Sequence, residues 1–453
     1  MKPVQYIIFV FTIVFSVSSC KKFIEIDPPR TDLIKSTVFT SHATANAAMM
    51  DIYYEMNRTG FASGSSTSIT YFATYSSDEQ VNYSIQFNQE FNDNELAPDN
   101  PFILSLWSEM YKTIYKANAV IEGVAASQNI SENLKKQLEG EAKFIRAFCH
   151  FYLVNLWGNV PLITTTDYRT NAAQPRTPTA EVYQQIIADL KDAQTLLPDN
   201  YAHANNERVR ANKGTATALL ARVNLHIGDW ANAETEATKI IQNTVLYGLI
   251  ADLNAVFRKN NTEAIFQLHN TFLPGDFLTF RVFSDGPSNG AFRPEFINNF
   301  ELNDQRLTSW VRSITAVNGI TYFFPGKYKF LSIGAEYSTI FRLAEQYLIR
   351  AEARAQLNNI SGAQADLNVI RSRAGLGNTS AGDKPSLITA IEHERIVELF
   401  TEQGLRWLDL KRTGRADAVL APIKGSTWQS TDVLYPIPEY QILNSSLTQN
   451  AGY

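Results

Sequence analysis

A pattern of five positions occurs twice in this chain of 453 residues, and it limits the fold more than any other feature of the sequence. Both copies have the offsets 0, 7, 9, 12 and 16, and they consist of Ala221, Gly228, Trp230, Ala233 and Ala237, and of Ala351, Asn358, Ile360, Ala363 and Leu367. Small residues at a helix crossing, a turn residue and an apolar plug are typical of the tetratricopeptide hairpin. Generic packing of antiparallel helices is the alternative, but two copies in one register favour stacked repeats, which build a curved scaffold.

Helical periodicity also dominates the rest of the chain. Thr177 and Pro178 predict the start of one helix, with threonine as the cap and proline at the first helical position. Its apolar face and its end are marked by Val182, Ile186, Leu190, Ala193, Leu197 and Pro198. This face resembles the second half of a further repeat, whose first half would lie around Ala147.

Similar apolar stripes occur at residues 105–125, 132–156, 213–242, 340–374 and 386–412. No linker rich in glycine, serine or charge separates them, and strand-like alternation is scarce. We therefore predict a single, mostly α-helical domain over residues 20–453, with repeat-like helices at about 105–242 and 340–412.

The first twenty residues have the pattern of a bacterial lipoprotein signal peptide. Lys2 precedes an almost unbroken apolar run from Val4 to Val17, and two serines then lead to Cys20. A basic start, an apolar stretch and a small-residue end are typical of secretion, and a cysteine directly after them is the residue that lipoprotein pathways acylate. The run is shorter than the about 20 residues that span a bilayer. We predict a signal peptide at 1–19, lipid on Cys20 and a tether at 20–36.

The charge balance argues against a nucleic-acid-binding protein. Removal of residues 1–19 takes away one of the 40 basic residues and none of the 45 acidic ones, so the mature chain has a net charge of −6. Binding to nucleic acid or to anionic membranes depends on basic patches. The other cysteine, Cys149, has no partner if Cys20 is acylated, and its apolar helical setting predicts a buried, inert thiol.

Two long stretches, about 58–104 and 270–335, lack clear periodicity and are rich in aromatic residues. Such long irregular segments in a compact protein are usually functional or disordered, and disordered chains lack rings. Rings beside amides and hydroxyls suit a neutral, hydroxyl-rich ligand, although most of them are expected to pin the loops to the helices. The rings with a polar handle amid polar neighbours, and hence the candidate ligand contacts, are Tyr75, Tyr83, Trp310 and Tyr322.

The sequence contains no recognisable catalytic constellation, and we expect neither an enzyme nor a cofactor or metal. The six histidines show no paired metal spacing, and neither a nucleophile elbow nor a phosphate loop occurs. The densest ionisable cluster runs from Glu392 to Arg412. Because Glu402 and Arg406 are four residues apart, and Asp409 and Arg412 are three apart, we interpret it as a helix stabilised by its own ion pairs.

Several motifs together resemble the SusD/RagB family, the nutrient-capturing surface lipoproteins of Bacteroidetes. The likeness spans the mature chain and is carried by residues 23–29 after Cys20, 141–147, Leu156-Trp157-Gly158-Asn159-Val160-Pro161-Leu162, 342–353, 370–375, 394–412, Leu434-Tyr435-Pro436-Ile437-Pro438 and 449–453. One departure is Gln403, which stands between Glu402 and Gly404, where the family often has the glutamate and glycine adjacent.

The resemblance implies tetratricopeptide-like hairpins on one side of the molecule and a loop-rich binding side on the other. It also implies a lipid-anchored, outward-facing protein of the outer membrane that binds an oligosaccharide and passes it to a SusC-like, TonB-dependent transporter. Peptide capture, as in RagB-like members, is the nearest alternative. A scaffold lipoprotein that holds partner proteins through its repeats is a further one. The family's ligand aromatics lie in variable loops, so the four candidate rings rest on this sequence alone.

Overall fold

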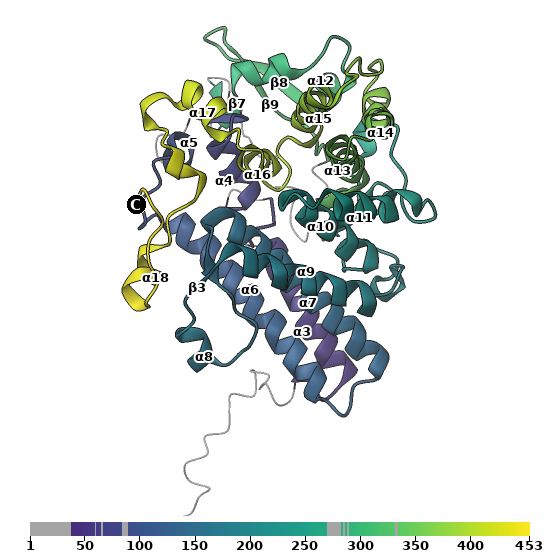
Figure 1. Ribbon diagram of the computed structural model, residues 1–453, viewed down its shortest axis with the longest axis vertical. Helices are drawn as coiled ribbons and strands as arrows, with labels where there is room; N and C mark the ends of the chain where they lie inside the picture. Colours follow the sequence, from purple (N-terminus) through teal and green to yellow (C-terminus); the bar gives the residue numbers. More distant parts are fainter. Residues whose placement is uncertain are drawn as a thin grey trace, which may run out of the picture.

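The computed structural model describes residues 38–453, except residues 59, 65–66, 84–88, 270–281, 284–285, 288–289 and 331–333 and the side chains of residues 282, 283 and 286. The predicted signal peptide, the acylation site Cys20 and the tether lie outside the described residues. Within them, the protein is mostly helical and carries a few two-stranded sheets (Figure 1).

The two predicted repeats are confirmed as helical hairpins. The first is α10 (Lys213–His226) with α11 (Trp230–Gln242), and the second is α13 (Leu343–Gln356) with α14 (Ile360–Arg373). The turn residues Gly228 and Asn358 both adopt a positive φ, 74° and 62°. Glycine and asparagine tolerate this left-handed conformation best, which explains why they stand at the same offset. The small residues of both copies are fully buried.

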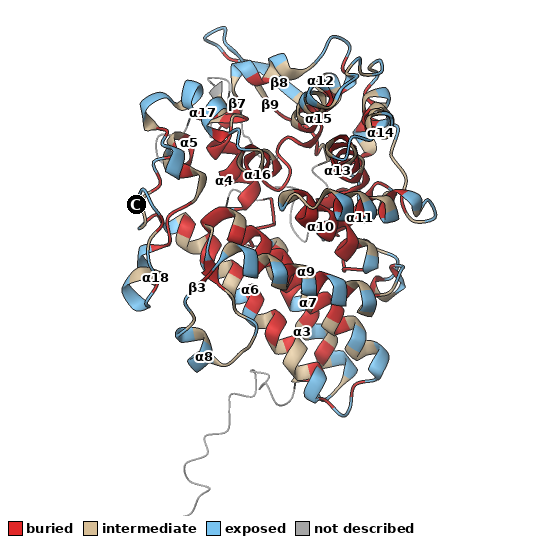
Figure 2. Ribbon diagram, in the orientation of Figure 1, coloured by how far each residue is buried: buried red, intermediate tan, exposed pale blue. Residues whose placement is uncertain are grey.

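These hairpins continue a row of packed helices. The row begins with α3 (His42–Arg58), α6 (Pro101–Ala126), α7 (Glu132–Trp157) and α9 (Thr179–Leu196), and it reaches α15 (Lys384–Leu399) beyond α13 and α14. Consecutive members of the row contact each other, including α7 with α9 and α11 with α13. Figure 2 shows the buried faces of these helices turned toward one another.

The start of α9 differs by one residue from the prediction. Thr177 is not the cap, because it belongs to the short strand β3 (Arg176–Thr177), which pairs with β2 (Val160–Pro161). Pro178 is the N-cap residue and the helix begins at Thr179. Strand pairing therefore fixes a residue whose type alone suggested a helix cap.

A second, less regular part of the chain covers one end of this row. It contains α4 (Ile69–Ser76), β1 (Gln80–Asn82), α5 (Gln89–Asp93), β7 (Gly290–Phe292), α12 (Gln305–Trp310), β8 (Val311–Thr315), β9 (Thr321–Pro325), α16 (Leu405–Arg412) and α17 (Ala416–Lys424). Strand β1 pairs with β7, and β8 forms a hairpin with β9 at the top of Figure 1. The stretch 58–104 is thus less irregular than expected, because α4 and α5 lie within it.

The remaining elements are short. They are α8 (Tyr168–Ala172), α18 (Glu439–Asn444), β4 (Ala264–Leu268), β10 (Ser338–Arg342), β5 (Val282–Phe283), β6 (Gly286–Pro287) and the 3₁₀ turns at Ala202–Ala204, Leu253–Ala255, Pro294–Asn299, Gly425–Thr427 and Ser430–Val433. Strand β10 pairs with β4 next to the helical row. No helix in the described part of the chain combines the length and the apolar character needed to cross a membrane.

A buried network of ions joins the helical row to the loop-rich part. At its centre Glu398 of α15 accepts hydrogen bonds from Arg306 (3.0 Å), Arg342 (2.5 Å) and Arg373. Burial by itself raises the pKa of Glu398, but the three guanidinium groups together hold it well below its usual range. The carboxylate therefore stays charged, which a buried group can do only when it is paired.

Candidate functional site

Tyr83 and Tyr322 meet on the loop-rich part of the surface. Their ring centroids are 5.5 Å apart and the rings are almost perpendicular, at 88°. Tyr83 is 42% exposed, and Tyr322 is partly exposed. Edge-to-face contact at this distance is a favourable geometry for two rings. The pair therefore presents ring surface to the solvent while each ring fixes the other.

Two pairs of strands bring these tyrosines together from positions far apart in the sequence. Tyr83 follows directly after β1, whose register with β7 aligns Asn82 with Gly290. Tyr322 lies on β9, opposite Ile314 of β8. Strand β9 also contacts β7, so the strand β7 lies between the two supports. Strand β8 is mostly exposed (Figure 2), whereas Tyr322 and Phe323 of β9 are partly buried and its last two residues are buried.

Polar groups lie beside the ring pair. The backbone N–H of Asn82 donates a hydrogen bond to the side chain of Asn92 (3.0 Å). The side-chain amide of Asn82 donates a hydrogen bond to the side chain of Gln89 (3.3 Å). Arg293 follows β7, and its charge lowers the pKa of Tyr83, although burial and Tyr322 raise that pKa overall. The Nε of Arg293 has no hydrogen-bond acceptor among the described residues, but it is shielded from the solvent and therefore from a ligand. An exposed side-chain amide, such as that of Gln89, can bind the hydroxyl groups of a ligand.

A second set of charges lies beneath this face. Arg406 of α16 donates two hydrogen bonds of 2.7 Å to Asp78, the residue two positions before β1. The next residue, Glu79, is buried, and burial raises its pKa to about 8 even though the Thr401 amide donates to it at 3.1 Å. The carboxyl group of Glu79 is therefore largely protonated at neutral pH.

The predicted ion pair between Glu402 and Arg406 is wrong. Helix α15 ends at Leu399 and α16 begins at Leu405, so the two residues do not share a helix and the spacing of four has no meaning. Glu402 instead accepts from Arg342 (2.7 Å) and Lys327 (2.5 Å), and Arg406 pairs with Asp78. The other predicted pair, Asp409 with Arg412, is present at 2.7 Å.

Tyr75 is fully buried in the structure. It lies on α4, where its ring contacts Tyr71 edge-on at 4.8 Å. The other side of the ring lies against β7, since a Cβ atom added at Gly290 would stand 2.3 Å from the Tyr75 hydroxyl. The ring has no face left for a ligand, so we do not retain it as a contact. In the sequence, the spacing of four residues between Tyr71 and Tyr75 indicates a helix, and this spacing could have predicted that Tyr75 lies on a buried helix face.

Trp310 is also fully buried. Its Nε1 donates to the carbonyl oxygen of Leu253 (2.8 Å), and its ring contacts Phe257 and Phe400. The ammonium group of Lys327 lies 5.0 Å from the ring centroid. The polar handle that suggested a ligand contact thus has a protein partner. Trp310 holds the loop-rich part to the helical row instead.

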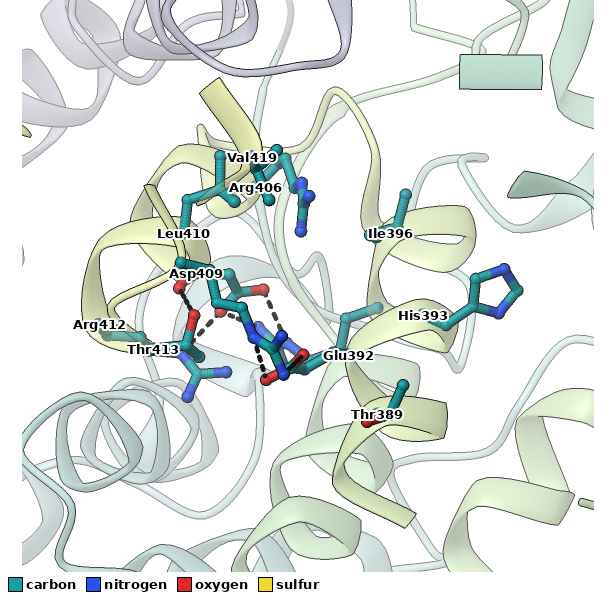
Figure 3. Close-up of a pocket in the computed structure, with 12 residues that line it drawn as sticks. Thr389, Glu392, His393, Ile396, Arg406, Asp409, Leu410, Arg412, Thr413 and Val419 are labelled. Carbon is teal, nitrogen blue, oxygen red and sulfur yellow. Dashed lines mark hydrogen bonds and ion pairs between the residues drawn. The ribbon is translucent and has the colours of Figure 1, made fainter. Parts of the chain in front are cut away.

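The ionisable cluster between residues 392 and 412 surrounds a cavity of about 200 Å³ between α15, α16 and α17 (Figure 3). In its wall Asp409 accepts hydrogen bonds from Arg395 (2.8 Å) and Arg412 (2.7 Å). Arg412 also pairs with Glu352 of α13 (2.6 Å), and Arg415 pairs with Glu392 (2.7 Å). These pairs link three helices and the turn before α17, which supports a structural role for the cluster.

The histidines and the cysteine give no sign of a reactive centre. No group of three or more potential metal-binding side chains occurs in the described part of the chain. Burial lowers the pKa of His150 and of His226 to about 3, so both rings are neutral. Cys149 is fully buried, and burial raises the pKa of its thiol far above the usual range. This agrees with the predicted inert thiol.

The structure therefore shows stacked helical hairpins that support a loop-rich face, on which one exposed and one partly exposed ring meet. Comparison with known proteins gives the same picture. A family model described as "Starch-binding associating with outer membrane" matches residues 22–225, and one described as "SusD family" matches residues 330–453. Together with the motifs between residues 23 and 453, these matches show that the protein belongs to the SusD/RagB family.

Individual relatives support this assignment. The chain is 26% identical to "SusD-like protein P25" of Formosa agariphila, with 100% of both chains covered, and 29% identical to "SusD-like protein P2" of the same organism, with 81% and 83% covered. Among solved structures, it resembles a "Laminarin binding SusD-like protein" with a TM-score of 0.78, 23% identity and coverage of 91% and 100%. It also resembles "Surface glycan-binding protein A from Bacteroides thetaiotaomicron" with a TM-score of 0.76, 20% identity and coverage of 92% and 100%. At these identities the solved structures show the shared fold.

Proposed function

We propose that this protein is a lipid-anchored outer-membrane protein that captures oligosaccharides at the cell surface and delivers them to a SusC-like, TonB-dependent transporter. Membership in the SusD/RagB family supports this role, and two of the structural relatives carry names that state glycan or laminarin binding. The lipoprotein pattern that ends at Cys20 supports the anchor. The protein acts by binding and release, without turnover of the ligand.

The ring pair of Tyr83 and Tyr322 is the observation that carries the proposal. A sugar that covers one ring face buries roughly 60 Å², which contributes on the order of 1.5 kcal/mol at about 25 cal/mol per Å². Two ring contacts and a few hydrogen bonds, less the cost of ordering the ligand, give a dissociation constant of about micromolar to millimolar. Weak binding of this kind suits a protein that must release its ligand into a transporter.

Calorimetry with purified protein tests the ligand. Laminarin oligosaccharides, starch oligosaccharides and mixed peptides are titrated into the unmodified chain and into a Tyr322→Ala variant. We expect binding to at least one saccharide and about a tenfold loss in the variant, the loss of one ring contact. Tyr54→Ala is a matched control, because Tyr54 is 40% exposed but lies on α3. Binding to peptides and to no saccharide would establish peptide capture instead.

Fractionation of cells tests the anchor and the partner. Cys20→Ala should move the protein from the detergent phase to the aqueous phase, since a lipid chain contributes about 0.8 kcal/mol per buried methylene. Mild detergent extraction and pull-down through this protein should recover a TonB-dependent barrel, because a shared membrane and a short tether raise their effective concentration. Continued detergent partitioning of the variant would refute the lipid anchor. Recovery of the protein alone would refute the proposed partner.

A further inference from the structure

A cavity of about 350 Å³ lies between α6, the segment around α8, and α18. In Figure 1 α8 and α18 are at the lower left, whereas β8 and β9 are at the top, so the cavity is on a different part of the surface from Tyr83 and Tyr322. Its volume falls within the range of about 300–1,000 Å³ that is usual for small-molecule sites. Neither the ion pairs of Figure 3 nor the ring pair of the loop-rich face reaches it.

Three rings on one face of α6 form one wall of this cavity. Trp107, Tyr111 and Tyr115 follow one another at intervals of four residues, so they lie along the same side of the helix. Their exposure increases from Trp107 (3%) at the base to Tyr115 (48%) at the rim. The centroids of Trp107 and Tyr111 are 4.9 Å apart, and the Tyr111 hydroxyl donates to the Pro161 carbonyl (2.8 Å). The wall is thus fixed in place while Tyr115 offers an open face.

Side-chain amides form the opposite walls. Asn171 of α8 donates to the carbonyl oxygen of Thr165 (2.8 Å), which holds the side chain and leaves its oxygen as an acceptor. Gln441 and Asn444 of α18 line the cavity from the other side. Among the described residues, Gln441 forms hydrogen bonds through its backbone, and its side-chain amide has no hydrogen-bond partner. An amide that can both donate and accept is suited to hydroxyl groups.

The lining contains no charged side chain, and this distinguishes the cavity from others in the molecule. The cavity in Figure 3 is lined by Arg395, Arg406, Arg412 and Arg415 together with carboxylates. The groove between α9, α10 and α11 includes Lys191, Lys213 and Lys239. The binding free energy of a ligand in the α6 cavity therefore comes from contact with the rings and from hydrogen bonds to the amides. The ligand needs no charged group, because no charged side chain lines the cavity. This combination describes a neutral sugar, whose C–H surface packs on rings while its hydroxyls bind amides.

We infer that the cavity between α6, α8 and α18 is a second binding site for a neutral saccharide, with Tyr115 as the stacking ring and Gln441 as a hydrogen-bonding partner. The inference rests on the proposed function only for the class of ligand. A protein with two separate saccharide sites binds a second chain, or a second part of one chain, while the first site is occupied.

Calorimetry in a background with a weakened first site tests this inference. In the double variant Tyr83→Ala with Tyr322→Ala, where loss of both rings weakens the first site about a hundredfold, the neutral oligosaccharide that the unmodified chain binds is titrated again. A residual binding class with about one ligand per protein, at an affinity above that of the weakened first site, is expected. Adding Tyr115→Ala to this background should weaken the residual class about tenfold, the loss of one ring face. Gln441→Ala is the second variant, since its partly exposed side chain can be shortened without opening the core. Tyr168→Ala is the matched control, because Tyr168 is an exposed tyrosine of α8 that does not line the cavity.

The outcomes separate this inference from the proposed function. If the unmodified chain shows a single class of saccharide binding that Tyr83→Ala and Tyr322→Ala weaken and that Tyr115→Ala and Gln441→Ala leave unchanged, the second site does not exist and the proposed function stands. If Tyr115→Ala abolishes capture of a partner barrel and leaves saccharide binding intact, the cavity is a protein contact and the inference is refuted. If no saccharide binds the unmodified chain, the proposed function itself fails. Thermal unfolding of each variant confirms that the fold is retained.

Discussion

The loop-rich part carries aromatic rings both at its base, where it packs against the helical row, and on its outer face, and these two sets of rings differ in burial. Trp310 at the end of α12 is fully buried and hydrogen-bonded to Leu253, whereas Tyr322 on the next hairpin is partly exposed and meets the Tyr83 ring at nearly a right angle. The two residues are close in sequence and have similar neighbours. Both rings carry a polar handle, so burial, and not the handle, separates a ring that holds the fold from a ring that is open to the solvent.

Breaking an ion pair inside the helical row should have the largest effect. Arg222 of α10 and Glu345 of α13 are buried and share two hydrogen bonds of 2.7 Å. Arg222→Leu leaves the carboxylate buried without its partner, so the free energy of unfolding should fall by about 3–5 kcal/mol. Chemical denaturation measures this change.

Two controls sharpen that measurement. Lys112 is 59% exposed and pairs with Glu55, and Lys112→Ala should cost only about 0.2–1 kcal/mol. The double variant Arg222→Leu with Glu345→Leu should recover most of the lost stability, because no unpaired charge remains. A loss below about 1 kcal/mol for Arg222→Leu would mean that the pair does not hold the two hairpins together.

Trp310→Phe should weaken the fold and leave binding unchanged. The substitution keeps a buried ring but removes the Nε1 donor, and the carbonyl oxygen of Leu253 then has no partner from this side chain. A buried polar group left unsatisfied costs about 1–3 kcal/mol. Denaturation and saccharide titration of the same protein measure both properties. A large loss of affinity with unchanged stability would place Trp310 in the ligand site after all.

In contrast to Trp310→Phe, Tyr83→Ala should weaken saccharide binding and leave the stability of the fold almost unchanged. Loss of one ring contact is expected to weaken saccharide binding about tenfold, or about 1.4 kcal/mol, with little change in the melting temperature because Tyr83 is 42% exposed. Tyr83→Phe keeps the ring and should lose less than about threefold, the cost of a lost hydroxyl contact at a wet surface. Equal losses for both variants would show that the hydroxyl group, and not the ring face, binds the ligand.

Glu79 should make the free energy of unfolding of the protein depend on pH. Burial raises its pKa from 4.5 to about 8, so the folded protein binds one more proton than the unfolded chain between these values. The contribution of Glu79 to stability is then greatest below pH 4.5 and falls as the pH rises toward 8, by about 1.4 kcal/mol per pH unit in the middle of the window. In Glu79→Gln this contribution should vanish. Parallel denaturation of both proteins at pH 6 and pH 7.5 measures the difference, and identical slopes would contradict the raised pKa.

Local sequence patterns were sufficient to predict the two hairpins of the helical row. The offsets around Ala221 and Ala351 identified both hairpins, because small residues at a helix crossing and a left-handed turn residue are local requirements. The same local reasoning failed at Thr177 and at the pair of Glu402 and Arg406. In each case a contact from elsewhere in the chain, the strand β2 or the charges Arg342 and Asp78, decided the structure.

The candidate site depended on contacts that the sequence does not display. A polar handle and polar neighbours selected four rings, and this criterion could not separate Tyr83 and Tyr322 from Tyr75 and Trp310. The buried rings lie on helices that pack against the core, whereas the two others lie at the end of β1 and on an exposed hairpin. Arg293 was not predicted at all, because its position beside Tyr83 comes from the pairing of β1 with β7.

The sequence by itself determined the helical repeats, their turns, the lipoprotein pattern and the family, because each of these depends on residues close together in the chain or on motifs in a fixed order. Only the tertiary structure decided which rings are exposed, which charges pair and where cavities with uncharged walls form. These properties depend on the burial of side chains by segments distant in sequence. Burial determines the free energy of a ring, an ion pair or a carboxyl group more strongly than the residues beside it.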